Sequence, residues 1–171
     1  MISCLVADES AKEFLWDSPK VVSAFTAELG MLDSERDEYA TNLATAASNS
    51  IATAKASPAS LVLGRNLITL ALHLSPRNKR ALIVNFQLSK GILPEIAEGN
   101  YSLPVLARLI FVRSEVLTKQ GGAENAKLAR YFTQLAAELD PKNEDAVYAS
   151  EMQRLDHGVV DWAALAGKGS N

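Results

Sequence analysis

Two stretches of this chain are close copies of each other: residues 70–81 read LALHLSPRNKRA, and residues 135–146 read LAAELDPKNEDA. Each copy combines an apolar helix end with a proline, which cannot continue a helix, and an asparagine, which is able to cap the next helix. A helix, a stop and a second helix are therefore predicted twice. Such repetition indicates helix pairs stacked on one another, an architecture that commonly provides a binding surface.

The composition favours a single globular unit. The chain has 171 residues, which is enough for one domain or one compact array with its own core. Hydrophobic residues make up 48% and charged residues 22%, so an intrinsically disordered chain is excluded. A net charge of −3 disfavours nucleic acid and anionic membranes as partners, because both call for a clustered positive field. No stretch of the sequence approaches the roughly 20 apolar residues of a transmembrane helix.

Helical periodicity runs through most of the chain, whereas the alternation typical of strands is essentially missing. From residue 34 onward, the expected helices cover about residues 34–55, 58–74, 79–90, 102–120, 123–139, 143–155 and 159–166. The helix at 58–74 is apolar around most of its circumference, so we expect it at the centre of the assembly. An earlier short helix is predicted to begin at Ser18 and Pro19 and to end at Gly30.

The fold prediction is therefore all-α, in three parts. Residues 1–33 form an irregular N-terminal segment with one or two short helices, residues 34–166 form a helical repeat domain, and residues 167–171 form a flexible tail. The apolar start of the chain lacks the basic region of an export signal, so a cytoplasmic location is the default expectation. A trimmed export signal stays open as the alternative.

From residue 34 onward, and most clearly over 103–165, the chain resembles the tetratricopeptide repeat, a helix–turn–helix unit of 34 residues. That family places small residues at two fixed positions of its second helix, just before a proline. Counted back from the two prolines, these positions hold Gly64, Ala71, Ala129 and Ala136. The resemblance implies an array of antiparallel helix pairs that forms a short right-handed α-solenoid.

The match to this repeat is divergent. Pro76 and Pro141 lie 65 residues apart, three short of two full units, and the family's Trp, Leu-Gly and Tyr positions in the first helices are mostly missing. The alternative is an irregular helical bundle in which a common type of helix stop occurs twice.

Residues suited to catalysis or metal binding are few, and no cofactor or metal is expected. The single Cys4 cannot form an internal disulfide, and neither His73 nor His157 has a second histidine four residues away. His73 lies near a helix end and His157 precedes a stop glycine, so we expect structural roles for both. Cys4 with either histidine is a conceivable nucleophile pair, but nothing in the sequence brings them together.

The resemblance also implies where a partner would bind. Some members of the family grip a chaperone's terminal carboxylate with Lys, Asn and Arg, and that set is absent from the corresponding positions here. These positions instead carry a mixed, partly apolar surface, which is suited to a peptide or helix of a protein partner. The predicted partner-binding residues are Arg80, Ile83, Gln87, Phe111, Tyr148 and Met152.

Three hypotheses of function follow. The first is a non-catalytic protein–protein interaction or scaffold module that binds an unidentified partner on a concave helical face. The second is a structural domain of a larger assembly, or a homo-oligomer, that covers an apolar surface by association. The third is an enzyme of unknown class, which requires a cleft that joins Cys4 to a histidine.

Overall fold

The regular structure of this chain is helical, as the sequence predicts. A computed structural model describes residues 14–21, 24–99 and 101–167, and these residues contain helices and no strand. The helices are α1 (Asp33–Thr53), α2 (Pro58–Leu74), α3 (Lys79–Ser89), α4 (Leu103–Gln120), α5 (Ala123–Leu139), α6 (Glu144–His157) and α7 (Trp162–Leu165). The predictions that concern Cys4 and residues 168–171 of the tail lie outside the described residues.

The two repeated stretches form the same turn. After α2, the Ser75 N–H donates to the Ala71 carbonyl (2.9 Å), and the Asn78 N–H donates to the Ser75 carbonyl (3.0 Å). After α5, the equivalent bonds run from Asp140 to Ala136 (3.0 Å) and from Asn143 to Asp140 (3.0 Å). Pro76 and Pro141 therefore occupy equivalent turns.

Both asparagines cap the next helix, which confirms that prediction. The Asn78 Oδ1 accepts from the Ala81 N–H at the start of α3 (2.9 Å), and the Asn143 Oδ1 accepts from the Ala146 N–H at the start of α6 (3.2 Å). Each bond satisfies a backbone donor that has no partner inside its helix.

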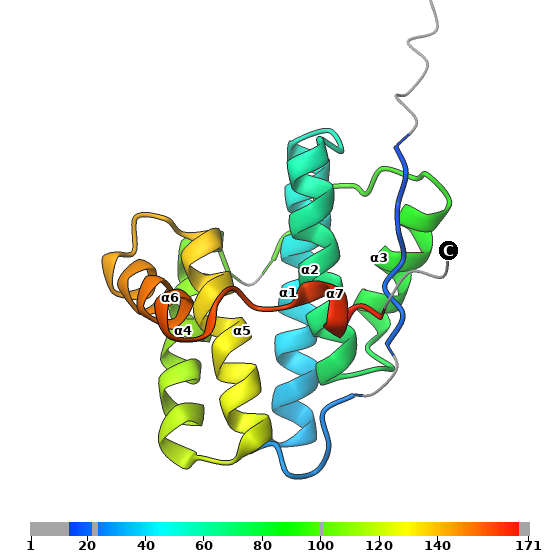
Figure 1. Ribbon diagram of the computed structural model, residues 1–171. Coiled ribbons are helices and arrows are strands. Elements are labelled where there is room, and N and C mark those ends of the chain that lie inside the picture. The colour runs from blue at the N-terminus through cyan, green and yellow to red at the C-terminus, as the bar shows by residue number, and fades with distance from the viewer. Residues whose placement is uncertain (1–13, 22–23, 100, 168–171) are drawn as a thin grey trace, which may run out of the picture.

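Helices α1 to α6 form two groups, α1–α3 and α4–α6 (Figure 1). In the first group α1 pairs with α2, and α3 packs on both; in the second, α4 pairs with α5, and α6 packs on α5. Between the groups, residues 92–99 contain no helix. Figure 1 places α3 and α6 on opposite sides of the molecule, with α1 and α2 between them.

Small residues lie where helices meet, as the resemblance implies. A Cβ added to Gly64 in α2 would lie 2.5 Å from the Cδ1 of Ile51 in α1, so this pair of helices approaches closely at a glycine. Ala71 and Ala136 are fully buried, and Ala129 nearly so. The central position expected for α2 agrees with the burial of its residues from Leu67 to Leu74.

The short helix predicted after Pro19 is not formed: residues 14–21 and 24–32 contain turns and extended chain. The buried guanidinium of Arg36 in α1 explains why. It donates to four backbone carbonyls of this segment, those of Phe25 (3.1 Å), Thr26 (2.6 Å), Leu29 (3.3 Å) and Met31 (3.3 Å). The carbonyls of a helix all point along its axis, so a segment whose carbonyls converge on one side chain cannot be helical over those residues.

The N-terminal segment and α7 lie together across α2. The Lys20 N–H donates to the Ala166 carbonyl (2.8 Å), and the buried His73 of α2 bonds through its Nε2 to the Leu165 carbonyl. The ring of Trp162 packs edge-on against Tyr131 of α5, with centroids 4.9 Å apart. His73 thus has the structural role that the sequence predicted.

Candidate functional site

Helix α4 is buried on one side and leaves an apolar stripe on the other. Leu106, Ile110 and Leu117 are at most 2% exposed. Four further apolar residues on α4 are 37–51% exposed, namely Val105, Leu109, Val112 and Val116, and we call them the α4 stripe. Their spacing of four, three and four residues is that of the contact seam of a coiled coil. α4 therefore leaves a row of apolar side chains partly exposed to solvent.

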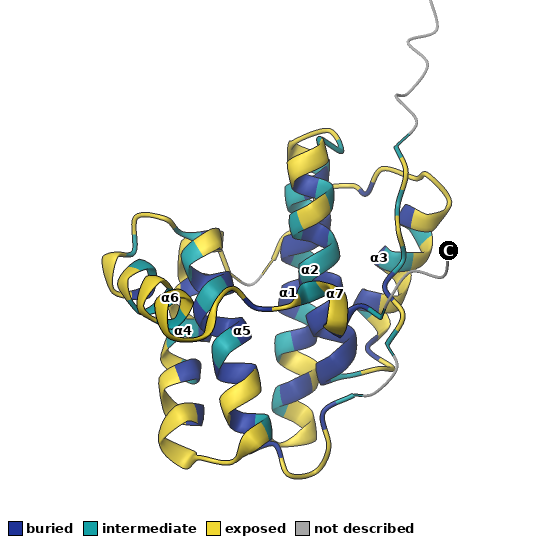
Figure 2. Cartoon of the chain, viewed as in Figure 1, coloured by how far each residue is buried: buried dark blue, intermediate teal, exposed yellow. Residues whose placement is uncertain are grey.

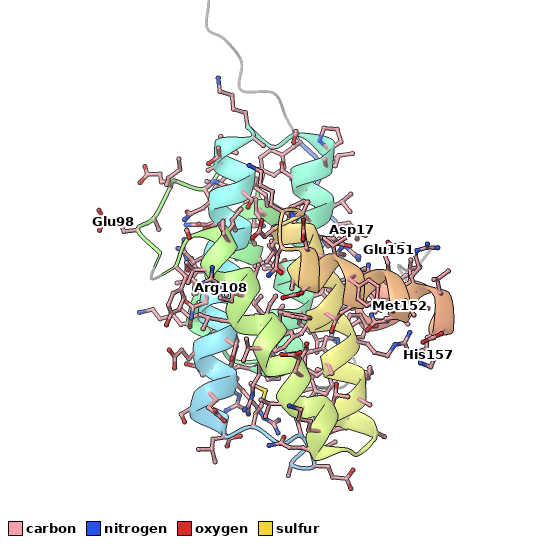
Figure 3. All side chains as sticks on the ribbon, turned by 90° about the vertical axis from the view of Figure 1, so that its left-hand side faces the viewer. Asp17, Glu98, Arg108, Glu151, Met152 and His157 are labelled. Carbon is pink, nitrogen blue, oxygen red and sulfur yellow. The ribbon has the colours of Figure 1, made fainter. Side chains whose placement is uncertain are left out.

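Helix α6 adds a second exposed apolar edge. Only Ala146 of this helix is buried, whereas Tyr148, Met152 and Leu155 are 40–69% exposed and follow one another at four and three residues. Figure 2 shows how much of α4 and α6 is exposed. Figure 3 looks onto this side of the molecule, with Arg108 of α4 and Met152 of α6 labelled.

A cleft of about 850 Å³ separates the two helices. Phe111, Val112 and Tyr148 supply its aromatic and apolar lining. Its charged lining residues carry both signs: Arg108, Glu115, Asp140, Lys142, Glu144 and Asp145. On α6, Arg154 donates to Glu151 (2.9 and 2.7 Å), and this hydrogen bond lowers the pKa of the Glu151 carboxyl. The surface is therefore apolar along the helices and charged at its margins, as protein interfaces commonly are.

The six residues predicted to bind a partner fall into two groups. Phe111 and Tyr148 line the cleft between α4 and α6, and Met152 lies one turn further along α6. Arg80, Ile83 and Gln87 lie on α3, at the other side of the molecule in Figure 1. The two groups do not line a common cleft.

The α3 group is partly covered by the chain itself. Arg80 and Gln87 share a cleft of about 380 Å³ with residues 92–97, and the Arg80 Nη2 donates to the Ser48 Oγ (2.8 Å). The Asn49 side chain of α1 holds these residues by donating to the Ala97 carbonyl (2.8 Å) and accepting from the Ala97 N–H (2.9 Å). Ile83, the third residue of this group, is 41% exposed, so the α3 part of the predicted surface is covered only in part.

A further cleft, of about 550 Å³, lies between the α1–α2 pair and residues 99–106. Its lining is neutral and mostly small: Asn42, Thr45, Ala46, Asn49, Ser50, Thr53, Ala54, Ser57, Ala59, Ser60, Leu63, Gly99, Tyr101, Ser102, Leu103 and Leu106. Such a lining offers hydrogen bonds and apolar contact but no acid, base or thiol.

Within the described ranges, no three His, Cys, Asp or Glu side chains gather closely enough to hold a metal ion. None of the helices described is long and apolar enough to span a membrane. His157, at the end of α6, is exposed.

Compared with protein-family models, with curated proteins and with solved structures, the chain matches none of them. The interpretation of the site rests on its own geometry.

Proposed function

We propose that this chain is a non-catalytic protein–protein interaction module whose docking face consists of the α4 stripe and the exposed edge of α6. The observation that carries this proposal is the α4 stripe itself. Four apolar side chains, each more than a third exposed, lie in one row beside a cleft that contains Phe111 and Tyr148. Contiguous apolar surface with a polar rim is typical of sites that bind other proteins, and a helix is the ligand such a row accepts best.

The tetratricopeptide-like reading of the sequence supports the same face. In an array of helix pairs, α1 and α4 are first helices of their pairs, α2 and α5 are second helices, and α3 and α6 follow the two equivalent turns. A regular array would then place another helix after α3. Here residues 92–99 contain no helix, so the side of α4 against which such a helix would pack stays uncovered.

Affinity capture with matched variants tests the proposal. We would tag the full chain and recover bound proteins from an extract of the source organism. Val112→Glu and Tyr148→Glu place a charge on the docking face, while Phe86→Glu makes the same type of change at an equally exposed position of α3. Because an apolar anchor at a protein interface contributes at least about 1.4 kcal/mol, we expect recovery of the partner to fall about tenfold for the first two variants.

The control should recover the partner as wild type does, and all variants should melt like the parent. Equal recovery with Val112→Glu, Tyr148→Glu and the wild type would exclude α4 and α6 as the docking face.

A further inference from the structure

We infer that the α4 stripe binds a second copy of this chain, with the two α4 helices antiparallel. The inference rests on the proposed function, because it names the partner of the same face. The spacing of the α4 stripe reads the same in both directions, so an inverted copy meets it in register. Val105 of each copy then lies opposite the partner's Val116, and Leu109 opposite the partner's Val112. Four apolar layers result from one two-fold axis.

The charges beside the stripe fit the same arrangement. Arg108 immediately precedes Leu109, and Glu115 immediately precedes Val116, so both lie on the same flank of the α4 stripe. In an antiparallel helix pair these flanks face each other, which places Arg108 beside the partner's Glu115, and Glu115 beside the partner's Arg108. Within the described residues, neither side chain has a hydrogen-bond or ion-pair partner. The antiparallel arrangement thus gives two contacts between opposite charges, both formed by Arg108 and Glu115.

A parallel pair fits less well. It would set the flank with Arg108 and Glu115 against the opposite flank of the partner, which carries Leu106 and Arg113. Leu106 is 2% exposed, and the Arg113 Nη2 already donates to the Gly30 carbonyl (2.8 Å) and pairs with Glu35. The antiparallel copy uses only side chains that are exposed.

Charge exchange tests the pairing and its direction. A seam of four layers is small, so we expect an affinity in the micromolar range and would measure the mass of the full chain by sedimentation at roughly 100 µM. Wild type should be dimeric. Arg108→Glu places a carboxylate opposite a carboxylate in both contacts, and Glu115→Arg a cation opposite a cation, so each variant alone should weaken the dimer about tenfold or more. The double variant Arg108→Glu/Glu115→Arg should recover it.

Mixing the two single variants gives the most specific result. One chain then carries acidic residues at both positions and the other basic residues, so an antiparallel mixed dimer has two favourable contacts, and we expect it to form where neither variant dimerises alone. Val112→Glu should abolish every dimer, and Phe86→Glu should leave all of them unchanged. Dimers that are insensitive to the charge variants, or a mixture that stays monomeric, would overturn the antiparallel pairing.

A wild type that is monomeric at this concentration would also overturn the inference. The proposed function fails by a different result, the absence of any effect of Val112→Glu on the capture of a partner, whether a second copy or another protein, so the two failures are distinguishable.

Discussion

The same residue in two equivalent turns meets different surroundings. Asn78 is 2% exposed, and besides its cap its Nδ2 donates to the Asp37 carbonyl (3.1 Å), the Asp37 Oδ1 (2.9 Å) and the Thr41 Oγ1 (2.8 Å). It therefore ties the start of α3 to the first turns of α1. Asn143 is only half-buried and caps α6 alone.

We therefore expect Asn78→Ala to cost more stability than Asn143→Ala. Loss of a cap alone costs about 1 kcal/mol, which is the value expected at Asn143. At position 78 the polar groups of Asp37 and Thr41 also lose a buried partner, which raises the expected cost to about 2–4 kcal/mol. Urea unfolding of both variants measures the difference. Equal losses would show that the bonds to α1 contribute nothing beyond the cap.

At the scale of elements, each repeated stretch contains the end of a helix, α2 or α5, and in each of these helices a small residue is fully buried. Ala71 in α2 and Ala136 in α5 have no exposed surface. Close packing leaves no room for a longer side chain, so strain follows any enlargement at these positions.

Ala71→Leu and Ala136→Leu should each destabilise the protein by roughly 1–3 kcal/mol through overpacking. Asn143→Ala is the control, because Asn143 lies just beyond α5, the helix that contains Ala136, and the change removes only a helix cap. Thermal unfolding should rank both leucine variants below this control. Leucine variants that melt like the parent would mean that these alanines do not lie at close helix crossings, and the repeat-like reading would fail.

Local chemistry explains which elements could be predicted from the sequence. The stops at Pro76 and Pro141 and the caps at Asn78 and Asn143 depend on neighbouring residues, and the structure confirms them. The helix predicted after Pro19 fails because its carbonyls converge on Arg36, a residue of the next helix that the periodicity of the segment itself does not take into account.

The candidate site was only partly predictable. Phe111, Tyr148 and Met152 were found from the resemblance, but the α4 stripe was not separated from the buried residues of the same helix. The spacing of four, three and four residues between its members is the sequence signal that could have revealed the α4 stripe. Which side of α4 stays exposed, however, depends on its packing against α5, and the periodicity of α4 alone cannot show this.

At the scale of the whole molecule, the N-terminal segment and side chains between the groups connect them. The Gly30 N–H donates to the Asn125 Oδ1 of α5 (2.7 Å), Thr26 bonds to Glu124, and Tyr39 of α1 packs on Phe132 of α5 with ring centroids 5.5 Å apart. Burial raises the pKa of the Tyr39 hydroxyl above its ordinary value. These contacts therefore join the two groups of helices into one body, which carries the α4 stripe on its surface.

The central claim is that α4 and α6 form the face by which this molecule docks on a second copy of itself. Its most direct test is a dilution series followed by two-dimensional NMR of backbone amides. We predict that resonances of residues 105–116 and 148–155 shift with protein concentration. Those of residues 82–86 and 92–96, which also carry exposed apolar side chains, should stay in place. Concentration-dependent shifts confined to these α3 and inter-group residues, with α4 and α6 unchanged, would contradict the account.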